Sequence, residues 1–326
     1  MRVFGQFAAI LCACGTLVWQ GESLHGNAQA PSTDERAAKV LVDARAALGG
    51  EEKLAAIKSF TTTGRTRRVQ GDSIVPIEFE ILVEFPDKYL RKDEVPAQES
   101  EPTTIGFNGP NLVQIPAPAP PEPRPGMPAP PPGQFENMLK TRAVTARQDF
   151  ARLMLGFFAT STQAYPLTFK YIGQAEAPQG KAHVLEASGE NNFKIRYFVH
   201  METSLPVMVS WTVPARPTPP ARTAPAPQAS GAAPPVQPPA PPAPGAAPST
   251  QHPAPSAQAP APSSQAPSVA PPEHRLYFAD YRDVDGIKLP FRLRRGIGGT
   301  NTTEETIFDR FRLNQKIDPR RFEVRK

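Results

Sequence analysis

One stretch decides the fold class of this chain: Ile77-Glu78-Phe79-Glu80-Ile81-Leu82-Val83-Glu84-Phe85. Its odd positions are all apolar, and three of its four even positions are glutamate. A period of two places the apolar side chains on one face of a strand and the glutamates on the other. Because antiparallel sheets can keep one face in water whereas parallel sheets are buried on both, the stretch predicts an antiparallel sheet.

Further strands are expected on both sides of this stretch. Segment 60–69 precedes it, 87–92 returns after Pro86 as a hairpin, and a short pair at 105–113 encloses an Asn-Gly turn. Later segments with strand composition are 167–172, 183–187, 193–199, 205–213, 275–281, 287–294 and 303–313. Asp285-Gly286 is a strong hairpin signal between two of them.

Two helices are expected. Ser32 and Glu35 form a capping-box pattern at the start of the first, and Gly49-Gly50 ends it. Its apolar residues recur at helical spacing: Ala37, Val40, Leu41, Ala44 and Leu48. The second helix spans 135–158, and its polar central part, 140–148, leaves open a break there.

The predicted elements therefore follow the order helix, four or five strands, helix, and about seven strands. No strand alternates regularly with a helix, so a parallel sheet is not expected. The order predicts an α+β, mostly antiparallel fold in which a large curved sheet is covered by helices.

Proline divides the chain. Of 326 residues 42 are proline, and most of these fall in segments 116–133 and 214–272, which contain almost no large hydrophobic residues. Such segments bury too little apolar surface to offset an ordering entropy of about 1–2 kcal/mol per residue. We interpret both as disordered inserts in a single domain formed by residues 31–213 and 273–326.

The N-terminus indicates export. Arg2, an interrupted apolar run over 3–18 and small residues before Ala30 are typical of a signal peptide, here residues 1–30, and predict a periplasmic protein. An alternative comes from Leu11-Cys12-Ala13-Cys14, which is similar to a bacterial lipobox. In that case the chain is an outer-membrane lipoprotein anchored through Cys14.

Charge and motif content favour a non-catalytic protein. The net charge of +5 is not gathered in runs, which argues against a nucleic-acid partner. Both cysteines lie in the first fourteen residues, and the histidines lack ligand spacing, so no metal and no cofactor are expected. Asp280, Asp283 and Asp285 are interpreted as a turn because Lys288 enters where a calcium loop needs ligands. The chain is expected to be a monomer.

Several segments together resemble the LolA/LolB-like outer-membrane lipoprotein-sorting superfamily. They are 46–54 (Ala-Ala-Leu-Gly-Gly-Glu-Glu-Lys-Leu), 57–64, 86–89, 106–109, 197–207, 280–291 (Asp-Tyr-Arg-Asp-Val-Asp-Gly-Ile-Lys-Leu-Pro-Phe) and 317–322. The resemblance covers nearly all of the chain outside the inserts. It implies an incomplete β-barrel whose concave apolar side, closed by helices, accommodates acyl chains.

Within such a half-barrel, some inward-facing side chains would line a cavity, whereas in an ordinary sheet they would form a solid core. The candidate ligand-binding residues are Phe79, Ile81, Val83, Ile195, Tyr197, Val207, Val209, Trp211, Leu289, Phe291 and Leu293. The predicted function is a periplasmic carrier of a lipid or of lipoprotein acyl chains. Two alternatives are a sensor that binds a lipid signal or an envelope membrane protein, and a wall-associated structural protein with the Pro-Ala tracts as spacers.

Overall fold

The computed structural model describes residues 32–96, 98–120, 131–177, 180–213, 271–298, 300 and 303–323. The predicted signal peptide, Cys14 and most of both proline-rich inserts lie outside these residues. The helices are α1 (Thr33–Leu48), α2 (Glu51–Ala55), α3 (Gln134–Phe158) and the short 3-10 helix η1 (Pro319–Phe322). The strands are β1 (Ser59–Gln70), β2 (Ser73–Glu84), β3 (Lys88–Glu94), β4 (Thr103–Asn108), β5 (Asn111–Ile115), β6 (Thr168–Ala177), β7 (Gly180–Gly189), β8 (Phe193–His200), β9 (Pro206–Thr212), β10 (Glu273–Val284), β11 (Ile287–Ile297) and β12 (Thr303–Leu313).

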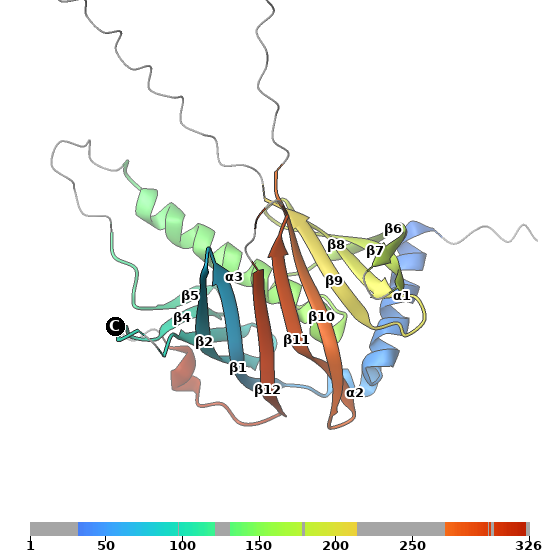
Figure 1. The fold of residues 1–326 in the computed structure, drawn as a ribbon, viewed down its shortest axis with the longest axis horizontal. Coiled ribbons are helices and arrows are strands. Elements are labelled where there is room, and N and C mark those ends of the chain that lie inside the picture. The colour runs from blue at the N-terminus through green and yellow to red at the C-terminus, as the bar shows by residue number, and fades with distance from the viewer. Residues whose placement is uncertain are drawn as a thin grey trace, which may run out of the picture.

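All of these strands belong to one antiparallel sheet, in the order β5-β4-β3-β2-β1-β12-β11-β10-β9-β8-β7-β6. The first and last strands of the chain, β1 and β12, pair at its centre. The sheet is open and curved, and α3 and α1 lie behind it in Figure 1. The predicted α+β fold, an antiparallel half-barrel covered by helices, is confirmed.

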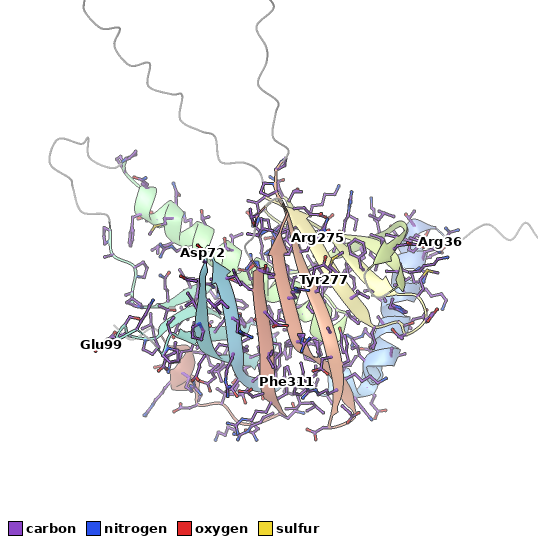
Figure 2. All side chains as sticks on the ribbon, in the orientation of Figure 1. Arg36, Asp72, Glu99, Arg275, Tyr277 and Phe311 are labelled. Carbon is purple, nitrogen blue, oxygen red and sulfur yellow. The ribbon has the colours of Figure 1, made fainter. Side chains whose placement is uncertain are left out.

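The alternating stretch forms most of β2. Phe79, Ile81 and Val83 are buried in the main core, and Glu78 on the other face is exposed. Leu82 departs from this alternation because the outer face is also covered here: it is buried with Leu90, Val113, Ile317 and Phe322 beside η1. Figure 2 shows the side chains over the whole sheet.

The capping box of α1 is present, since the Glu35 amide donates to the Ser32 hydroxyl and the Ser32 amide donates to the Glu35 carboxylate. The break left open in the second helix does not occur: α3 is continuous. In its central part, one side of the helix still faces the protein interior, where Ala143 and Ala146 are buried. Among the described residues, no helix is long and apolar enough to cross a membrane.

The main core lies between the concave face of the sheet and the helices. Phe150, Met154 and Phe157 of α3 fill its centre, and the aromatic rings of Phe60 and Phe311 pack around Phe157. On the outer face, a smaller cluster combines Ala182, Val184, Phe198, Val207 and Met208. Burial on the concave side thus depends on α3, which crosses the sheet from β4 and β5 toward β9.

The long insert interrupts a hairpin. Thr212 of β9 pairs with Glu273 of β10, and Trp211 pairs with His274, although segment 214–270 separates them in sequence. The two strands are therefore neighbours in the sheet whatever the length of their connection.

Deleting residues 217–271 is expected to preserve the fold. The deletion leaves Val213, Pro214, Ala215, Arg216 and Pro272 between the paired residues, close to common hairpin loop lengths of about 2–5 residues. Because closure entropy grows only with the logarithm of loop length, the change should be neutral or stabilising by at most about 2 kcal/mol. Thermal unfolding of both forms measures this, and a melting temperature many degrees lower in the deletion variant would show that the insert packs on the domain.

Candidate functional site

The predicted ligand-binding residues divide into three groups. Phe79, Val83, Ile195, Tyr197, Val209, Leu289 and Phe291 lie in the main core, where α3 and neighbouring side chains cover them. The Tyr197 hydroxyl, for example, donates to the Leu155 carbonyl of α3 at 2.9 Å. Only Ile81, Trp211 and Leu293 from the predicted set line the cavity described below.

The prediction that Val207 faces inward is wrong. It belongs to the outer-face cluster with Phe198 and Met208. The cause is a β-bulge: Phe198 pairs with Met208 and Val199 with Pro206, so Val207 is an extra residue without a partner opposite. An extra residue in one strand breaks the period-two alternation, and a simple count along the strand then assigns the wrong face.

A cavity of about 240 Å³ remains at one end of the concave face. Its apolar wall combines Ile81, Ala146, Leu153, Trp211, Leu276, Leu293 and Phe308. Its charged wall combines Arg68, Arg91, Asp93, Asp149, Arg152, Arg295 and Glu304. Ile105 also lines it and is 39% exposed, so the cavity reaches the surface there. The cavity is amphipathic, with apolar and charged walls.

The inward faces of the strands become polar toward this end. On β11, Leu289 and Leu293 are followed at the same period by Arg295. On β3, Tyr89 is followed by Arg91 and then by Asp93. These charged residues were not among the predicted site residues. Continuing the period of two beyond the apolar positions would have placed them on the inner face.

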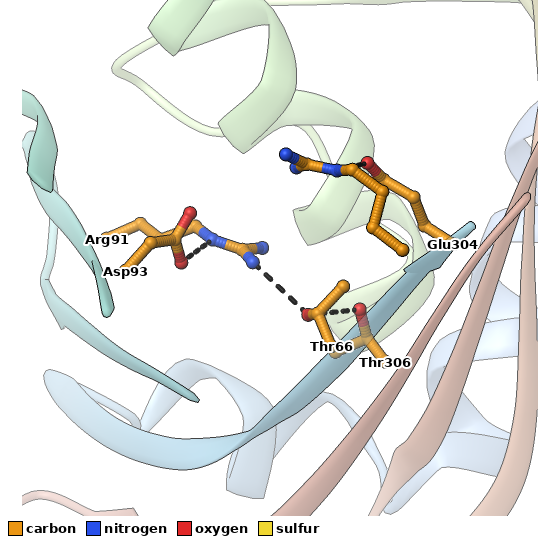
Figure 3. Close-up of polar contacts among 6 residues, drawn as sticks. Thr66, Arg91, Asp93, Glu304 and Thr306 are labelled. Atoms are coloured by element: carbon orange, nitrogen blue, oxygen red, sulfur yellow. Dashed lines mark hydrogen bonds and ion pairs between the residues drawn. The ribbon is translucent and has the colours of Figure 1, made fainter. Parts of the chain in front are cut away.

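Hydrogen bonds fix part of the charged wall (Figure 3). Arg91 donates from Nε to Asp93 at 2.7 Å and from Nη2 to the Thr66 hydroxyl at 3.3 Å. The Thr66 hydroxyl is 2.8 Å from that of Thr306. Burial alone would lower the pKa of Arg91, but the nearby Asp93, Tyr89 and Glu304 oxygens outweigh it, so its pKa is raised. Arg91 is thus a fixed, permanently charged part of the wall.

Arg68 and Glu304 complete this side of the cavity. The Arg68 Nε lies 2.5 Å from a Glu304 carboxylate oxygen, and the two residues face each other across β1 and β12. Both side chains are partly exposed, so the pair contributes little to stability, about 0–1 kcal/mol. Its effect on the cavity is to neutralise both charges.

Arg152 projects from α3 between two aromatic rings. Its guanidinium carbon is 4.3 Å from the centre of the Trp211 ring and 4.9 Å from that of Phe193. Nη1 donates to Asp149 at 2.8 Å. Burial lowers the pKa of Arg152, and Asp149 opposes this shift. Even so, an arginine remains charged at neutral pH, so a cation is held against the apolar wall.

His274 lies beside the same indole. Its ring stacks on Trp211 with centres 5.3 Å apart and an interplanar angle of 19°. Burial, followed by the charges of Arg295 and Arg152, lowers the pKa of His274, while Asp149 acts in the opposite direction. The imidazole is therefore neutral at neutral pH.

The lowered pKa of His274 predicts a loss of stability in mild acid. As the pH falls through about 6.5, the ordinary histidine pKa, the unfolded chain takes up a proton before the folded chain does. The free energy of unfolding should then fall until the pH passes the lower folded pKa. Urea unfolding of the wild type and of His274→Gln between neutral and mildly acidic pH measures this contribution. Burial also lowers the pKa of His183, so His183→Gln provides the comparison variant. If the free energy of unfolding depends on pH in the same way in the wild type and in His274→Gln, the lowered pKa of His274 is contradicted.

Two of the three aspartates near the β10–β11 turn make contacts within the hairpin itself. Asp283 accepts a hydrogen bond from the Gly286 amide, and Asp280 pairs with Arg282. Within the part of the chain that the structure describes, no group of three or more His, Cys, Asp or Glu residues could hold a metal ion.

Comparison with known proteins finds no matching family model and no matching curated protein. Solved structures with a similar backbone include a LolA superfamily protein from Nitrosomonas europaea, with 11% identity, a TM-score of 0.47 and coverage of 90% of this chain and 98% of that chain. Others are a DUF1329 family protein from Desulfovibrio piger (8% identity, TM-score 0.44, coverage 90% and 98%) and an outer membrane lipoprotein-sorting protein domain from Vibrio parahaemolyticus (8% identity, TM-score 0.42, coverage 88% and 97%).

Proposed function

We propose that this chain is an exported, non-catalytic binding protein that carries a lipid, or the acyl chains of a lipoprotein, with part of the ligand held in the cavity between α3 and the sheet. The observation that carries the proposal is the cavity itself. It interrupts an otherwise closely packed concave face, and apolar side chains from β2, β9, β11 and α3 converge on it.

The size of the cavity limits what it encloses. An apolar cavity of about 150 Å³ can hold a benzene molecule, and the cavity here measures about 240 Å³. Small-molecule sites in proteins usually occupy about 300–1,000 Å³. The enclosed part of the ligand is therefore one end of an acyl chain or its attachment point, and the remainder extends past the exposed Ile105 toward the surface.

A fluorescence measurement tests this binding directly. The sequence contains 2 tryptophans, Trp19 and Trp211, so the chain with Trp19→Phe has its single tryptophan in the cavity wall. Titration with dansyl-labelled undecanoate should quench Trp211 and give saturable energy transfer to the dansyl group. If the chain remains folded but Trp211 does not respond at any probe concentration, the proposal is wrong.

Two isoleucines provide a matched pair of variants. Ile105 and Ile172 are both exposed on strands, but only Ile105 lines the cavity. Ile105→Asn is expected to weaken probe binding because the apolar path to the surface becomes polar. Ile172→Asn should bind as the wild type does. Equal affinities in all three proteins would place the probe elsewhere on the surface.

Export is part of the proposal, and intact-mass analysis of the protein made in a bacterial host tests it. Cleavage at the predicted signal peptide would leave a chain that begins near Gln29 or Pro31. A diacylated N-terminal Cys14 would instead identify an anchored lipoprotein.

A further inference from the structure

The charges around the cavity do not balance. Arg68 pairs with Glu304 and Arg91 pairs with Asp93, so these four groups neutralise one another. Arg152 pairs with Asp149. Arg295 is the remaining cation, and among the described residues no carboxylate forms an ion pair with it. The lining thus carries one more positive than negative charge.

Arg152 also has an unused donor. The residue is 8% exposed, and its Nε is fully buried with no hydrogen-bond partner, although Nη1 reaches Asp149. Leaving a buried donor unpaired costs about 1–3 kcal/mol, and more when the group is charged. Because Arg152 lines the cavity, its guanidinium charge favours an anionic acceptor there.

Arg152 and Arg295 converge on one side chain. The guanidinium of Arg152 lies 4.3 Å from the centre of the Trp211 ring, and that of Arg295 lies 5.6 Å from it. Arg152 comes from α3 and Arg295 from the end of β11, and their like charges repel across the cavity. An anion between them would pair with both and relieve the repulsion.

We propose that the cavity selects an anionic amphiphile: Arg152 and Arg295 bind a carboxylate or phosphate beside Trp211, and the apolar wall takes the adjoining part of the hydrocarbon chain. The inference rests on the proposed function and deepens it by naming the ligand class. Part of the same lining is apolar and is formed by Leu153, Leu276 and Leu293. A site for a small hydrated anion would not need this apolar surface. A ligand that is charged at one end and apolar next to it matches both walls.

Titration of the Trp19→Phe chain with four compounds tests the proposal, with the fluorescence of Trp211 as the measure of binding. Dodecanoate and dodecyl phosphate carry the two head groups, dodecanol carries an uncharged head on the same tail, and inorganic phosphate has no tail. A hydrogen bond to a charged group is worth enough that both anionic amphiphiles should bind about tenfold or more tightly than dodecanol. Whichever of the two binds more tightly identifies the head group.

Adjacent arginines on β11 supply the matched variants. Arg295 lines the cavity, whereas Arg294 is exposed on the other face. Arg295→Gln should reduce the preference for dodecanoate over dodecanol several-fold, and Arg294→Gln should leave it unchanged. Arg152→Lys keeps the charge but removes the buried Nε, and it should also reduce the preference. If Arg152→Lys does not fold, the comparison of Arg295→Gln with Arg294→Gln still tests the proposal.

The outcomes separate this inference from the proposed function. Equal affinity for dodecanol and dodecanoate would overturn the anion site but leave a lipid carrier. Equal affinity for inorganic phosphate and dodecyl phosphate would overturn the amphiphile class, because the tail would then contribute nothing. The failure of every amphiphile to bind would overturn the proposed function and this inference together.

Discussion

Replacing Val209 by aspartate is expected to unfold the chain at neutral pH. Val209 lies on β9 opposite Tyr197 and is 0% exposed. An unpaired carboxylate there would lose its hydration without gaining a partner, which costs several kcal/mol, and total domain stability is only about 5–15 kcal/mol. Far-ultraviolet circular dichroism and urea unfolding measure the loss.

Val213 provides the matched control for this variant. It directly follows β9 but is 46% exposed. Val213→Asp should keep the wild-type free energy of unfolding within about 0.5 kcal/mol, as surface substitutions usually do. The Val209→Asp protein should also recover partly in acid, because protonation removes the buried charge. A folded Val209→Asp protein at neutral pH would show that water reaches this position and that the centre of the concave face is not a closed core.

Replacing Phe157 by alanine is expected to lower the free energy of unfolding by about 3–5 kcal/mol. Phe157 is 0% exposed, and its ring centre lies 5.5 to 6.2 Å from those of Phe60, Phe158, Phe308 and Phe311. These neighbours come from α3, β1 and β12 and cannot all move into the space that the ring leaves. Urea unfolding monitored by circular dichroism measures the change.

Phe135 is the control on the same helix. It lies in the first turn of α3 and is partly exposed. Phe135→Ala should cost less than half as much as Phe157→Ala because less surface and fewer contacts are lost. Similar costs at the two positions would mean that α3 does not close the concave face through its C-terminal half. The assignment of binding to the remaining cavity depends on that closure.

Trp211 occupies the boundary between closed core and cavity. Its ring belongs to the main core, yet it also lines the cavity beside Arg152 and His274. A smaller side chain there should therefore change both stability and ligand affinity. Val209 lies two residues before Trp211 on β9, and Phe157 lies on α3; substitutions at these two positions should affect mainly stability. The half-barrel thus combines a solid centre with a cavity at one end.

The sequence by itself determined the local structure. The alternation in β2, the Ser32–Glu35 capping box and the Asp285-Gly286 turn each depend on neighbours within a few residues. Their φ/ψ angles and the face that each side chain takes follow from that short range. The antiparallel fold class and the order of the elements were predictable for this reason.

The tertiary structure decided which part of the concave face is filled and which part is open. The polar residues of 140–148 gave no sign that α3 would continue unbroken over the sheet, because its stability there comes from contacts with distant strands. A bulge turned Val207 to the outer face. The charged cavity wall combines Arg91, Arg152 and Arg295 from three separate elements. In the sequence alone, charged residues on a strand usually indicate a face in water. Only the crossing of α3 over the end of the sheet brings these three arginines together around the cavity.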